Sequence, residues 1–246
     1  MVNPDVIRSI LGIIGNVTSF CLFCSPAPTI WRIFKNKSVE EFKFHPIVAG
    51  IINCFMWVFY SMPFVHPHSI LVTTINSVGL VMYICYNLVY LRYANNQKRK
   101  SMCIYYLAEV VFLAALICIT LLAFHTHTSR STFVGIFCDV FGIILYGAPL
   151  TIMYKVIKTK SVEFMPLTLS LAGLSNGVVW SAYAFIRFDP YILIGNGVGA
   201  ILAVAQLILY ACYYGSTPKE GKPVKDLVKP TAPQAPQVQM MTVSAV

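Results

Sequence analysis

Charged residues are scarce in this chain of 246 residues. Asp, Glu, Lys and Arg make up 11% of it, 57% is hydrophobic, and only nine residues are acidic. Soluble domains carry about 25% charged residues, so the composition excludes an ordinary soluble protein and predicts a chain embedded in lipid. Only two acids, Glu109 and Asp139, fall inside apolar segments. Relays of such groups, as proton-coupled carriers have, are therefore not expected in this chain.

Signals for disulfides and metal sites are equally weak. The eight cysteines, at positions 21, 24, 54, 85, 103, 118, 138 and 212, all lie in apolar segments. That placement is typical of reduced cysteines packed as small hydrophobic residues. The pairs His66/His68 and His125/His127 have no cysteine or acid beside them. We therefore expect no metal and no cofactor.

Long apolar segments are the feature that the chain does have. They cover residues 7–31, 45–65, 69–91, 102–124, 132–154, 166–186 and 190–214, and each is long enough to cross a bilayer. Backbone polar groups in lipid must be satisfied within the chain, which makes helices the default spanning element. The sequence thus predicts an all-α integral membrane protein with seven transmembrane helices. Residues 215–246, rich in Pro, Lys and Gln, are predicted to form a disordered tail.

Basic residues are divided unequally between the two sides of these segments. The segments 32–43, 92–100, 155–163 and 215–246 hold 15 of the 18 Lys and Arg. The positive-inside rule then predicts an extracellular amino terminus and a cytosolic carboxyl terminus. We interpret the net charge of +9 as the charge that sets the orientation in the membrane and contacts lipid headgroups. The cations are spread over several loops, which argues against a nucleic-acid surface.

An internal repeat determines the predicted architecture. Lys37-Ser38-Val39-Glu40 returns as Lys160-Ser161-Val162-Glu163 at an offset of 123, and Asn76-Ser77-Val78-Gly79 returns as Asn196-Gly197-Val198-Gly199 at an offset of 120. Helices 1–3 (residues 1–100) and 5–7 (131–214) are therefore two copies of one unit, and helix 4 (101–130) is a linker. Because the linker adds one crossing, both copies have the same orientation. The prediction is two parallel three-helix bundles joined by an inverting linker helix, in a 3+1+3 arrangement.

Asparagine and tryptophan recur at matching depths in the two copies. Residues four apart share a face of a helix, which pairs Asn53 with Trp57 and Asn176 with Trp180. Together with two asparagines of helices 3 and 7, they form a predicted belt of Asn53, Trp57, Asn76, Asn176, Trp180 and Asn196. An amide has one acceptor and two donors and an indole is a large rigid apolar surface, which suits the hydroxyls and apolar faces of a sugar. Asparagines also join helices in membranes, but their pairing with Trp by the repeat favours a ligand site.

Several segments resemble the SWEET sugar facilitators of plants. They are KTKSVEFMP at 158–166, VHPHS at 65–69, IN at 75–76, IRFDP at 186–190 and QLILYACYY at 206–214. The resemblance covers residues 3–214 and is greatest to the group associated with hexoses. It implies a bidirectional, facilitative uniporter that moves monosaccharides by alternating access. It also implies contact with membrane lipid, a plasma-membrane location and a homo-oligomer, for which a trimer is one option.

The resemblance assigns a role to two leucines. Leu22 and Leu145 are partners in the repeat, and in the family these positions line the cavity. Two leucines there favour a monosaccharide over a disaccharide, with ordinary core packing as the alternative. The cavity is not expected to be fully symmetric, since helix 1 has Ser19 where helix 5 has Gly142.

Gates are implied at both ends. Pro26, Pro46, Pro149 and Pro166 match the family's proline tetrad, and proline inside a helix removes a hydrogen bond and kinks it. Four kinks are expected to form a hinge and a cytosolic gate, while an ordinary helix start is the alternative for the second and fourth prolines. Tyr60, Tyr183 and Asp189 match the extracellular gate. Asp189 is expected to pair with a histidine of the 66–68 loop or with Arg187.

Other protein classes fit less well. A seven-helix receptor would lack the repeat, and a retinal protein needs a lysine in its last helix, whereas residues 190–214 contain none. A related amino-acid exporter of the Pro-Gln loop type would follow the prolines of helices 1 and 5 with Gln, where this chain has Ala27 and Leu150. An enzyme is not expected. A carrier of sucrose or another polyol with the same fold is the alternative that the sequence leaves open.

Overall fold

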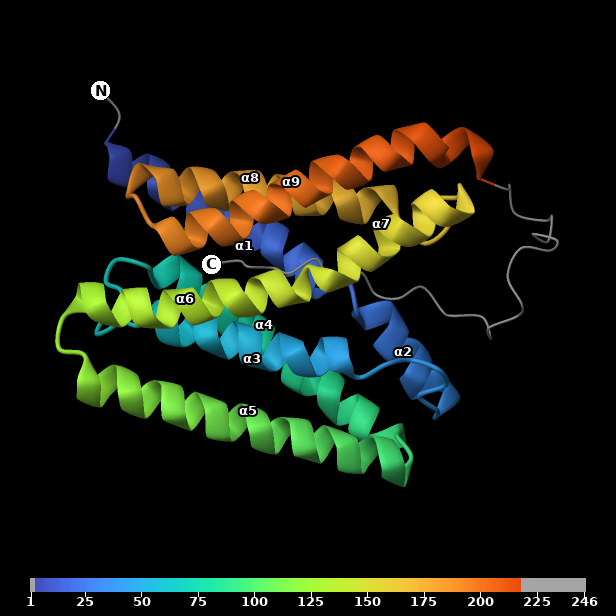
Figure 1. The fold of residues 1–246 in the computed structure, drawn as a ribbon, viewed down its shortest axis with the longest axis horizontal. Coiled ribbons are helices and arrows are strands. Elements are labelled where there is room, and N and C mark those ends of the chain that lie inside the picture. The colour runs from blue at the N-terminus through green and yellow to red at the C-terminus, as the bar shows by residue number, and fades with distance from the viewer. Residues whose placement is uncertain (1–2, 218–246) are drawn as a thin grey trace.

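The computed structural model describes residues 3–217, and all regular structure within them is helical. The elements are α1 (Pro4–Phe23), α2 (Ala27–Asn36), α3 (His45–Tyr60), α4 (Ile70–Tyr93), α5 (Asn96–Ala123), α6 (His127–Leu145), α7 (Gly147–Thr159), α8 (Leu167–Ile186), α9 (Pro190–Tyr213) and the short 3₁₀ helix η1 (Tyr214–Ser216). Figure 1 shows the α-helices lying roughly side by side along the long axis of the molecule.

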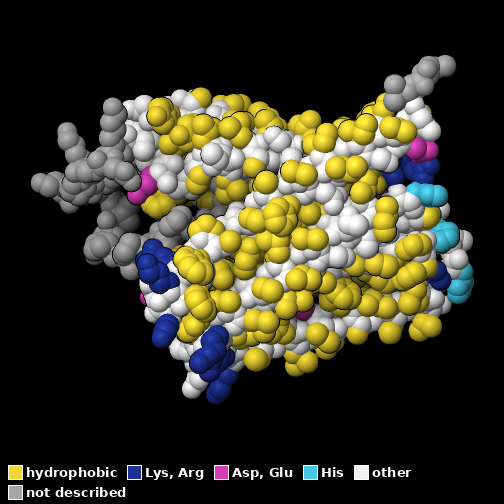
Figure 2. Space-filling model, turned by 180° about the vertical axis from the view of Figure 1, so that it is seen from behind, with side chains coloured by type: hydrophobic (Ala, Val, Ile, Leu, Met, Phe, Trp, Pro, Cys, Tyr) yellow, Lys and Arg dark blue, Asp and Glu magenta, His cyan; other side chains and the backbone are white. Residues whose placement is uncertain are grey.

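These helices make seven membrane segments, because α1 continues into α2 and α6 continues into α7. Six segments within the described residues are long and apolar enough to cross a membrane, and α3 is a shorter apolar helix of 16 residues. Apolar side chains cover most of the surface in Figure 2. The predicted all-α membrane fold with seven helices is confirmed.

Two of the four predicted proline kinks are present as breaks. Pro26 lies between α1 and α2, and Pro149 lies in the first turn of α7, directly after the break at Tyr146. Proline has no N–H to donate to the carbonyl four residues earlier, so neither helix can continue straight through. Figure 1 shows a break between α1 and α2 and a bend between α6 and α7.

The other two prolines do not kink their helices, so that part of the prediction is wrong. Pro46 is the second residue of α3, and Pro166 is the residue that precedes α8. At a helix start the missing N–H would have had no partner within the helix. The alternative interpretation of these two positions, an ordinary helix start, is the one that the structure supports.

The repeated sequence gives a repeated backbone. Lys37 directly follows α2 and Lys160 directly follows α7, and both residues have a left-handed conformation, with φ of 50° and 54°. This conformation is common at helix ends, because it lets the chain turn away from the axis. The two Lys-Ser-Val-Glu segments therefore leave their helices in the same direction.

Helix packing follows the three-helix units. In the first unit α1, α2 and α3 all pack on α4, and in the second α6, α7 and α8 all pack on α9. Helices in corresponding places run in the same direction, and α5 lies at one edge beside α3 and α6 (Figure 1). The Tyr106 hydroxyl of α5 donates to Asn87 Oδ1 of α4, 2.6 Å away. We call the α1–α4 and α6–α9 units the first and second halves.

The two ends of the molecule differ in charge. Lys37, Lys98 and Lys160 lie at the end where α2 and α7 finish, which we call the lysine end. The opposite end carries Asp189 and histidines, and we call it the Asp189 end. Figure 2 shows Lys and Arg side chains gathered at the first of these ends and His at the second.

The first residues of the predicted tail are ordered. Residues 214–216 form η1, and the Thr217 hydroxyl accepts a hydrogen bond of 2.9 Å from the backbone N–H of Val162. These contacts hold the end of α9 against the segment that follows α7, so disorder from residue 215 is incorrect. The rest of the predicted tail, 218–246, lies outside the described residues.

Two glycines bring α1 close to α8. A Cβ on Gly15 would lie 2.6 Å from Trp180 Cε2, and a Cβ on Gly12 would lie 3.0 Å from Tyr183 Cε2. Both aromatic rings therefore rest on the bare backbone of α1. This contact joins the first half to the second, and only glycine permits its present geometry.

We predict that Gly15→Ala lowers the melting temperature of the purified protein in detergent, because the added methyl group overlaps the Trp180 ring. Overpacking of this kind costs about 1–3 kcal/mol. Gly142→Ala is the matched control, since no heavy atom lies within 4 Å of a Cβ there. Alanine should stabilise that helix by up to about 1 kcal/mol. A Gly15→Ala protein that melts at or above the control would contradict the packing described.

Candidate functional site

All six residues of the predicted belt are buried between the packed helices. The exposed fraction of each is 5% or less, and both tryptophans are fully buried. Each tryptophan makes an edge-to-face contact with the tyrosine three residues later, Trp57 with Tyr60 and Trp180 with Tyr183. The repeat in the sequence is thus matched by a repeat in side-chain packing.

One side of the belt is held by α1. Trp180 Nε1 donates to Ser19 Oγ at 3.0 Å, and Ser19 in turn donates to Asn176 Oδ1 at 2.7 Å. Thr18 donates to the same oxygen at 2.9 Å. Asn176 therefore joins α8 to α1, the helix-joining role considered as the alternative to ligand binding. It also lines the cavity described below, so joining the helices does not exclude contact with a ligand.

The other side of the belt lacks this chain of hydrogen bonds. The repeat partner of Trp180 is Trp57, and its fully buried Nε1 has no hydrogen-bond partner among the described residues. The partner of Ser19 is Gly142, which carries no hydroxyl group. The asymmetry expected from these two positions is therefore present: the Trp180 indole N–H has a protein partner, and the Trp57 indole N–H has none within residues 3–217.

Asn76 and Asn196 occupy equivalent places on α4 and α9. The amide nitrogen of Asn76 donates to the carbonyl of Val72 at 3.0 Å, and that of Asn196 donates to the carbonyl of Ile192 at 2.9 Å. Each amide is thereby oriented by its own helix. Such bonds restrict side-chain rotation, which makes these asparagines suitable for holding a ligand in a defined position.

A cavity lies beside the belt, mostly within the second half. It is lined by Leu22, Tyr146, Pro149, Gly173, Asn176, Gly177, Asn196, Gly199, Leu202 and Gln206. Leu22, Asn176 and Asn196 are predicted substrate residues, and Pro149 is a predicted gate residue. Leu145 is half-buried and is not part of this lining, and neither are the remaining belt residues.

Sequence reasoning missed six of the lining residues. Among them is Gln206, which lies ten positions after Asn196 on α9. Asn196, Gly199 and Gln206 follow helical spacing along one face, and this spacing could have indicated them. Tyr146 could have been found as the residue at the helix break, beside Pro149.

The Asp189 end is closed by a cluster of three residues, which we call the Asp189 cluster. The Tyr60 hydroxyl donates to the Asp189 carboxylate, with both oxygens 2.9 Å away, and His66 Nε2 lies 3.0 Å from Asp189 Oδ2. The rings of Tyr60 and His66 stack with centroids 4.9 Å apart. Asp189 also accepts hydrogen bonds from the backbone of Tyr191 and Ile192 at the start of α9.

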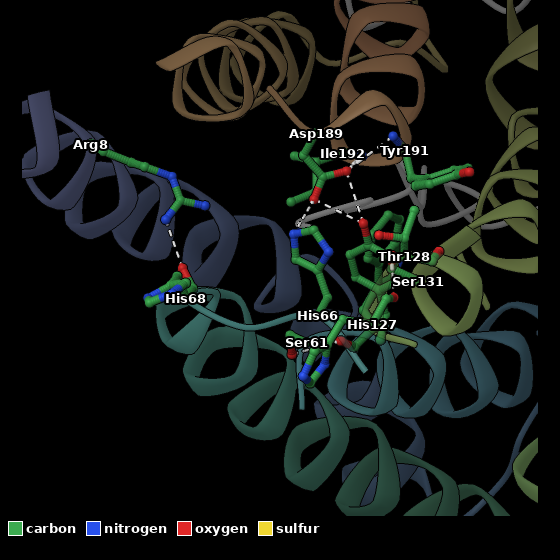
Figure 3. Close-up of polar contacts among 12 residues, drawn as sticks. Arg8, Ser61, His66, His68, His127, Thr128, Ser131, Asp189, Tyr191 and Ile192 are labelled. Atoms are coloured by element: carbon green, nitrogen blue, oxygen red, sulfur yellow. Dashed lines mark hydrogen bonds and ion pairs between the residues drawn. The ribbon is translucent and has the colours of Figure 1, made fainter. Parts of the chain in front are cut away.

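This cluster joins the two halves, because Tyr60 and His66 belong to the first and Asp189 to the second. Figure 3 shows His66 pointing toward Asp189 from the segment before α4. Asp189 is 1% exposed, and a buried charge is tolerated only when it is paired and hydrogen-bonded. Of the two expected pairings for Asp189, the histidine is present, while Arg187 instead lies 3.5 Å from Asp5.

Arg8 of α1 makes a second connection at this end. Its guanidinium carbon lies 3.9 Å from the centroid of the Tyr183 ring, and its Nη1 donates to the backbone carbonyl of His68 at 2.6 Å (Figure 3). Tyr183 is the repeat partner of Tyr60. Each of the two predicted gate tyrosines is therefore engaged by a charged side chain.

Contacts between the halves are fewer toward the lysine end. The main contacts between the halves among the described helices are α1 with α8 and α3 with α6. The short helices α2 and α7 pack mainly on helices of their own half, α4 and α9. The molecule is thus closed at the Asp189 end, whereas α2 and α7 leave the halves less tightly joined at the other.

Local hydrogen bonds also order the loop after α2. Arg32 Nη2 lies 2.6 Å from Glu40 Oε2, and Asn36 donates to Glu40 Oε1 at 2.8 Å. The hydrogen bonds from Asn36 and Arg32 lower the pKa of Glu40 below its usual value. The carboxylate therefore stays charged at neutral pH and holds the repeated Lys-Ser-Val-Glu segment near the end of α2.

Comparison with known proteins assigns this architecture to a family. Residues 9–98 and 132–218 match the model of the family described as "Sugar efflux transporter for intercellular exchange". Those two ranges correspond to the two copies of the repeat. The intervening residues include the linker helix α5.

Similar proteins occur in plants. The chain is 49% identical to "Bidirectional sugar transporter SWEET7b" of Oryza sativa subsp. indica, covering 98% of this chain and 91% of that protein. It is 52% identical to "Bidirectional sugar transporter SWEET4" of Arabidopsis thaliana, covering 89% and 88%. The fold matches a solved structure of a eukaryotic SWEET transporter with a TM-score of 0.82 and 31% identity, over 86% of this chain and 99% of that one.

We predict that Tyr60→Phe loosens the Asp189 end while leaving the ring stack on His66 in place. A hydrogen bond to a charged group contributes about 1.5–3 kcal/mol, so backbone amides of residues 187–193 should exchange with deuterium at least about tenfold faster. Tyr106→Phe, which removes a hydroxyl bonded to Asn87 at the linker, is the control and should leave that segment unchanged. Equal exchange in wild type and Tyr60→Phe would show that the cluster does not hold this end closed.

Proposed function

The chain belongs to the family of sugar efflux transporters for intercellular exchange, and we propose that it is a bidirectional uniporter for monosaccharides such as glucose. It is a multi-pass membrane protein and a transporter, not an enzyme. The observation that carries the proposal is the unequal closure of its ends. The Asp189 cluster joins the halves at one end, and the asparagine-lined cavity lies on the way to the other.

In this proposal the belt residues form the sugar site. Asn76 and Asn196 bind hydroxyl groups, Trp57 and Trp180 flank the ring, and Asn53 and Asn176 complete the set. Support comes from the burial of all six and from the amides that their own helices orient. The indole N–H of Trp57, which has no partner in the part of the chain that the structure describes, adds a donor that a sugar hydroxyl can accept from.

Leu22 and Leu145 limit the space beside the ring in this proposal. Leu22 is buried and lines the cavity, whereas Leu145 is half-buried. Side chains of this size leave less room than the smaller residues that a disaccharide would need. This is the basis for proposing a monosaccharide rather than sucrose.

Transport by alternating access requires two gates that do not open together. We assign Tyr60, Tyr183 and Asp189 to one gate and Pro26, Pro46, Pro149 and Pro166 to the other. The breaks at Pro26 and Pro149 support the second assignment, because they let α2 and α7 move separately from α1 and α6. The structure described here then corresponds to a carrier that faces the lysine end.

Orientation in the membrane follows from charge. The lysine end carries most of the basic residues, and the positive-inside rule places it in the cytosol. The amino terminus is then extracellular, and the Asp189 cluster is the extracellular gate. We further propose a plasma-membrane location and a homo-oligomer, for which a trimer is one option, on the basis of the family resemblance.

Binding should be weak, because a carrier must release its load. A dissociation constant near millimolar corresponds to only about 4 kcal/mol, which a few hydrogen bonds and one ring contact supply. No proton is required, since the belt contains amides and indoles rather than ionisable groups.

We predict saturable uptake of radiolabelled D-glucose into proteoliposomes, with the same rate in the presence and absence of a pH gradient. Asn76→Ala and Asn196→Ala should each lower uptake by about tenfold or more, the effect of losing one or two hydrogen bonds. Asn36→Ala is the control, because that asparagine is exposed at the lysine end, and it should transport normally. Folded wild-type protein that carries sucrose or another polyol but no glucose would contradict the monosaccharide proposal.

A further inference from the structure

Gln206 of α9 is a buried amide without a hydrogen-bond partner in residues 3–217. Its side chain is fully buried, and neither Oε1 nor Nε2 has a hydrogen-bond partner among the described residues. Buried polar groups are nearly always hydrogen-bonded, because leaving one unpaired is unfavourable. A glutamine that served to join helices would bond to a neighbouring helix, and no such bond is present here.

The position of Gln206 points to a ligand. It lines the same cavity as Asn176 and Asn196, close to the break that contains Pro149. Gln206 follows Asn196 by ten residues on α9, which places it about 15 Å nearer the lysine end at the rise of an α-helix. That separation along the helix is longer than a single pyranose ring, so Gln206 lies at a different level of the cavity from Asn196.

The equivalent position in the first half is occupied differently. The offset of 120 pairs Gln206 with Tyr86, whose hydroxyl donates to the carbonyl of Phe23 at 3.0 Å. Phe23 is in turn the repeat partner of Tyr146, and the Tyr146 hydroxyl donates to the carbonyl of Gly195. In the first half the polar group at this position, the Tyr86 hydroxyl, is thus bonded to the protein. In the second half the Gln206 amide lines the cavity instead.

We propose that Gln206 forms a second sugar-binding station between Asn196 and the lysine end. This inference rests on the proposed transport function and extends it to the release path. The amide supplies one acceptor and two donors, which match neighbouring hydroxyls of a sugar. A sugar leaving the belt exchanges its contacts with Asn196 for contacts with Gln206 before it reaches the cytosol, and a sugar entering from the cytosol meets Gln206 first.

The test compares the two directions of glucose transport in frog oocytes, where uptake and efflux are measured separately on protein of one orientation. Gln206→Met keeps the volume of the side chain and removes the amide. The half-saturation concentration for efflux should rise about tenfold, while that for uptake stays nearly constant. In a passive carrier the ratio of maximal rate to half-saturation concentration is the same for uptake and efflux. Because the uptake values stay nearly constant, the maximal efflux rate should rise by the same factor as the half-saturation concentration for efflux.

Stability provides the readout that separates this role from a structural one. Because Gln206 makes no bond within the described protein, Gln206→Met should melt at or above the wild-type temperature. Tyr86→Phe is the matched control, and it should leave both half-saturation concentrations unchanged. If Gln206→Met does not fold, Gln206→Asn retains a shorter amide and should show a smaller rise for efflux alone.

Failure of the proposal is distinguishable from failure of the proposed function. If wild type carries glucose and Asn196→Ala abolishes transport, but Gln206→Met leaves efflux unchanged, the second station is wrong and the carrier stands. A lower melting temperature with equal changes in both directions would assign Gln206 to structure and overturn the proposal. If folded wild type carries no glucose, both inferences fail together.

Discussion

The buried carboxylate of Asp189 is the interaction on which the arrangement of the two halves depends. It begins α9 by accepting backbone N–H groups, and it also accepts a hydrogen bond from Tyr60 and lies against His66 of the other half. A buried charge is strongly destabilising once a partner is removed. Separation of the halves at this end therefore exposes or strands the carboxylate, and water must replace the lost partners. These contacts favour closure at this end, which is consistent with the gate proposed there.

The two halves differ at a few positions of the repeat, and these differences make the two sides of the molecule chemically unequal. Two identical halves would treat a ligand equally on both sides, but α1 has Ser19 where α6 has Gly142, and α4 has Tyr86 where α9 has Gln206. The hydroxyls in the first half bond to the protein itself. The second half has no hydroxyl at these two positions. The polar groups concerned there, the indole N–H of Trp57 beside α6 and the amide of Gln206, lack partners among the described residues. Both of these buried polar groups thus lie where the repeat is broken, and both belong to the proposed sugar path.

Much of this structure follows from the sequence because the relevant physics is local. Composition predicts the seven helices, and the missing N–H of proline predicts the breaks at Pro26 and Pro149. Partners of individual side chains depend instead on how helices rotate against each other. For that reason the bonds from Thr18 and Ser19 to Asn176, and the contact of Arg8 with Tyr183, could not be predicted. The helix-start positions of Pro46 and Pro166 depend on where the loops end, which the apolar pattern specifies only to within a few residues.

The central claim is that the halves move so that one end opens as the other closes. Distances between spin labels in lipid nanodiscs measure this directly, with one pair at Phe64 and Phe188 near the Asp189 end and another at Lys35 and Lys158 near the lysine end, all four being exposed. On adding glucose, the account predicts a new population in which the first distance lengthens and the second shortens. Distances that lengthen together at both ends, or that do not respond to sugar at either end, would contradict it.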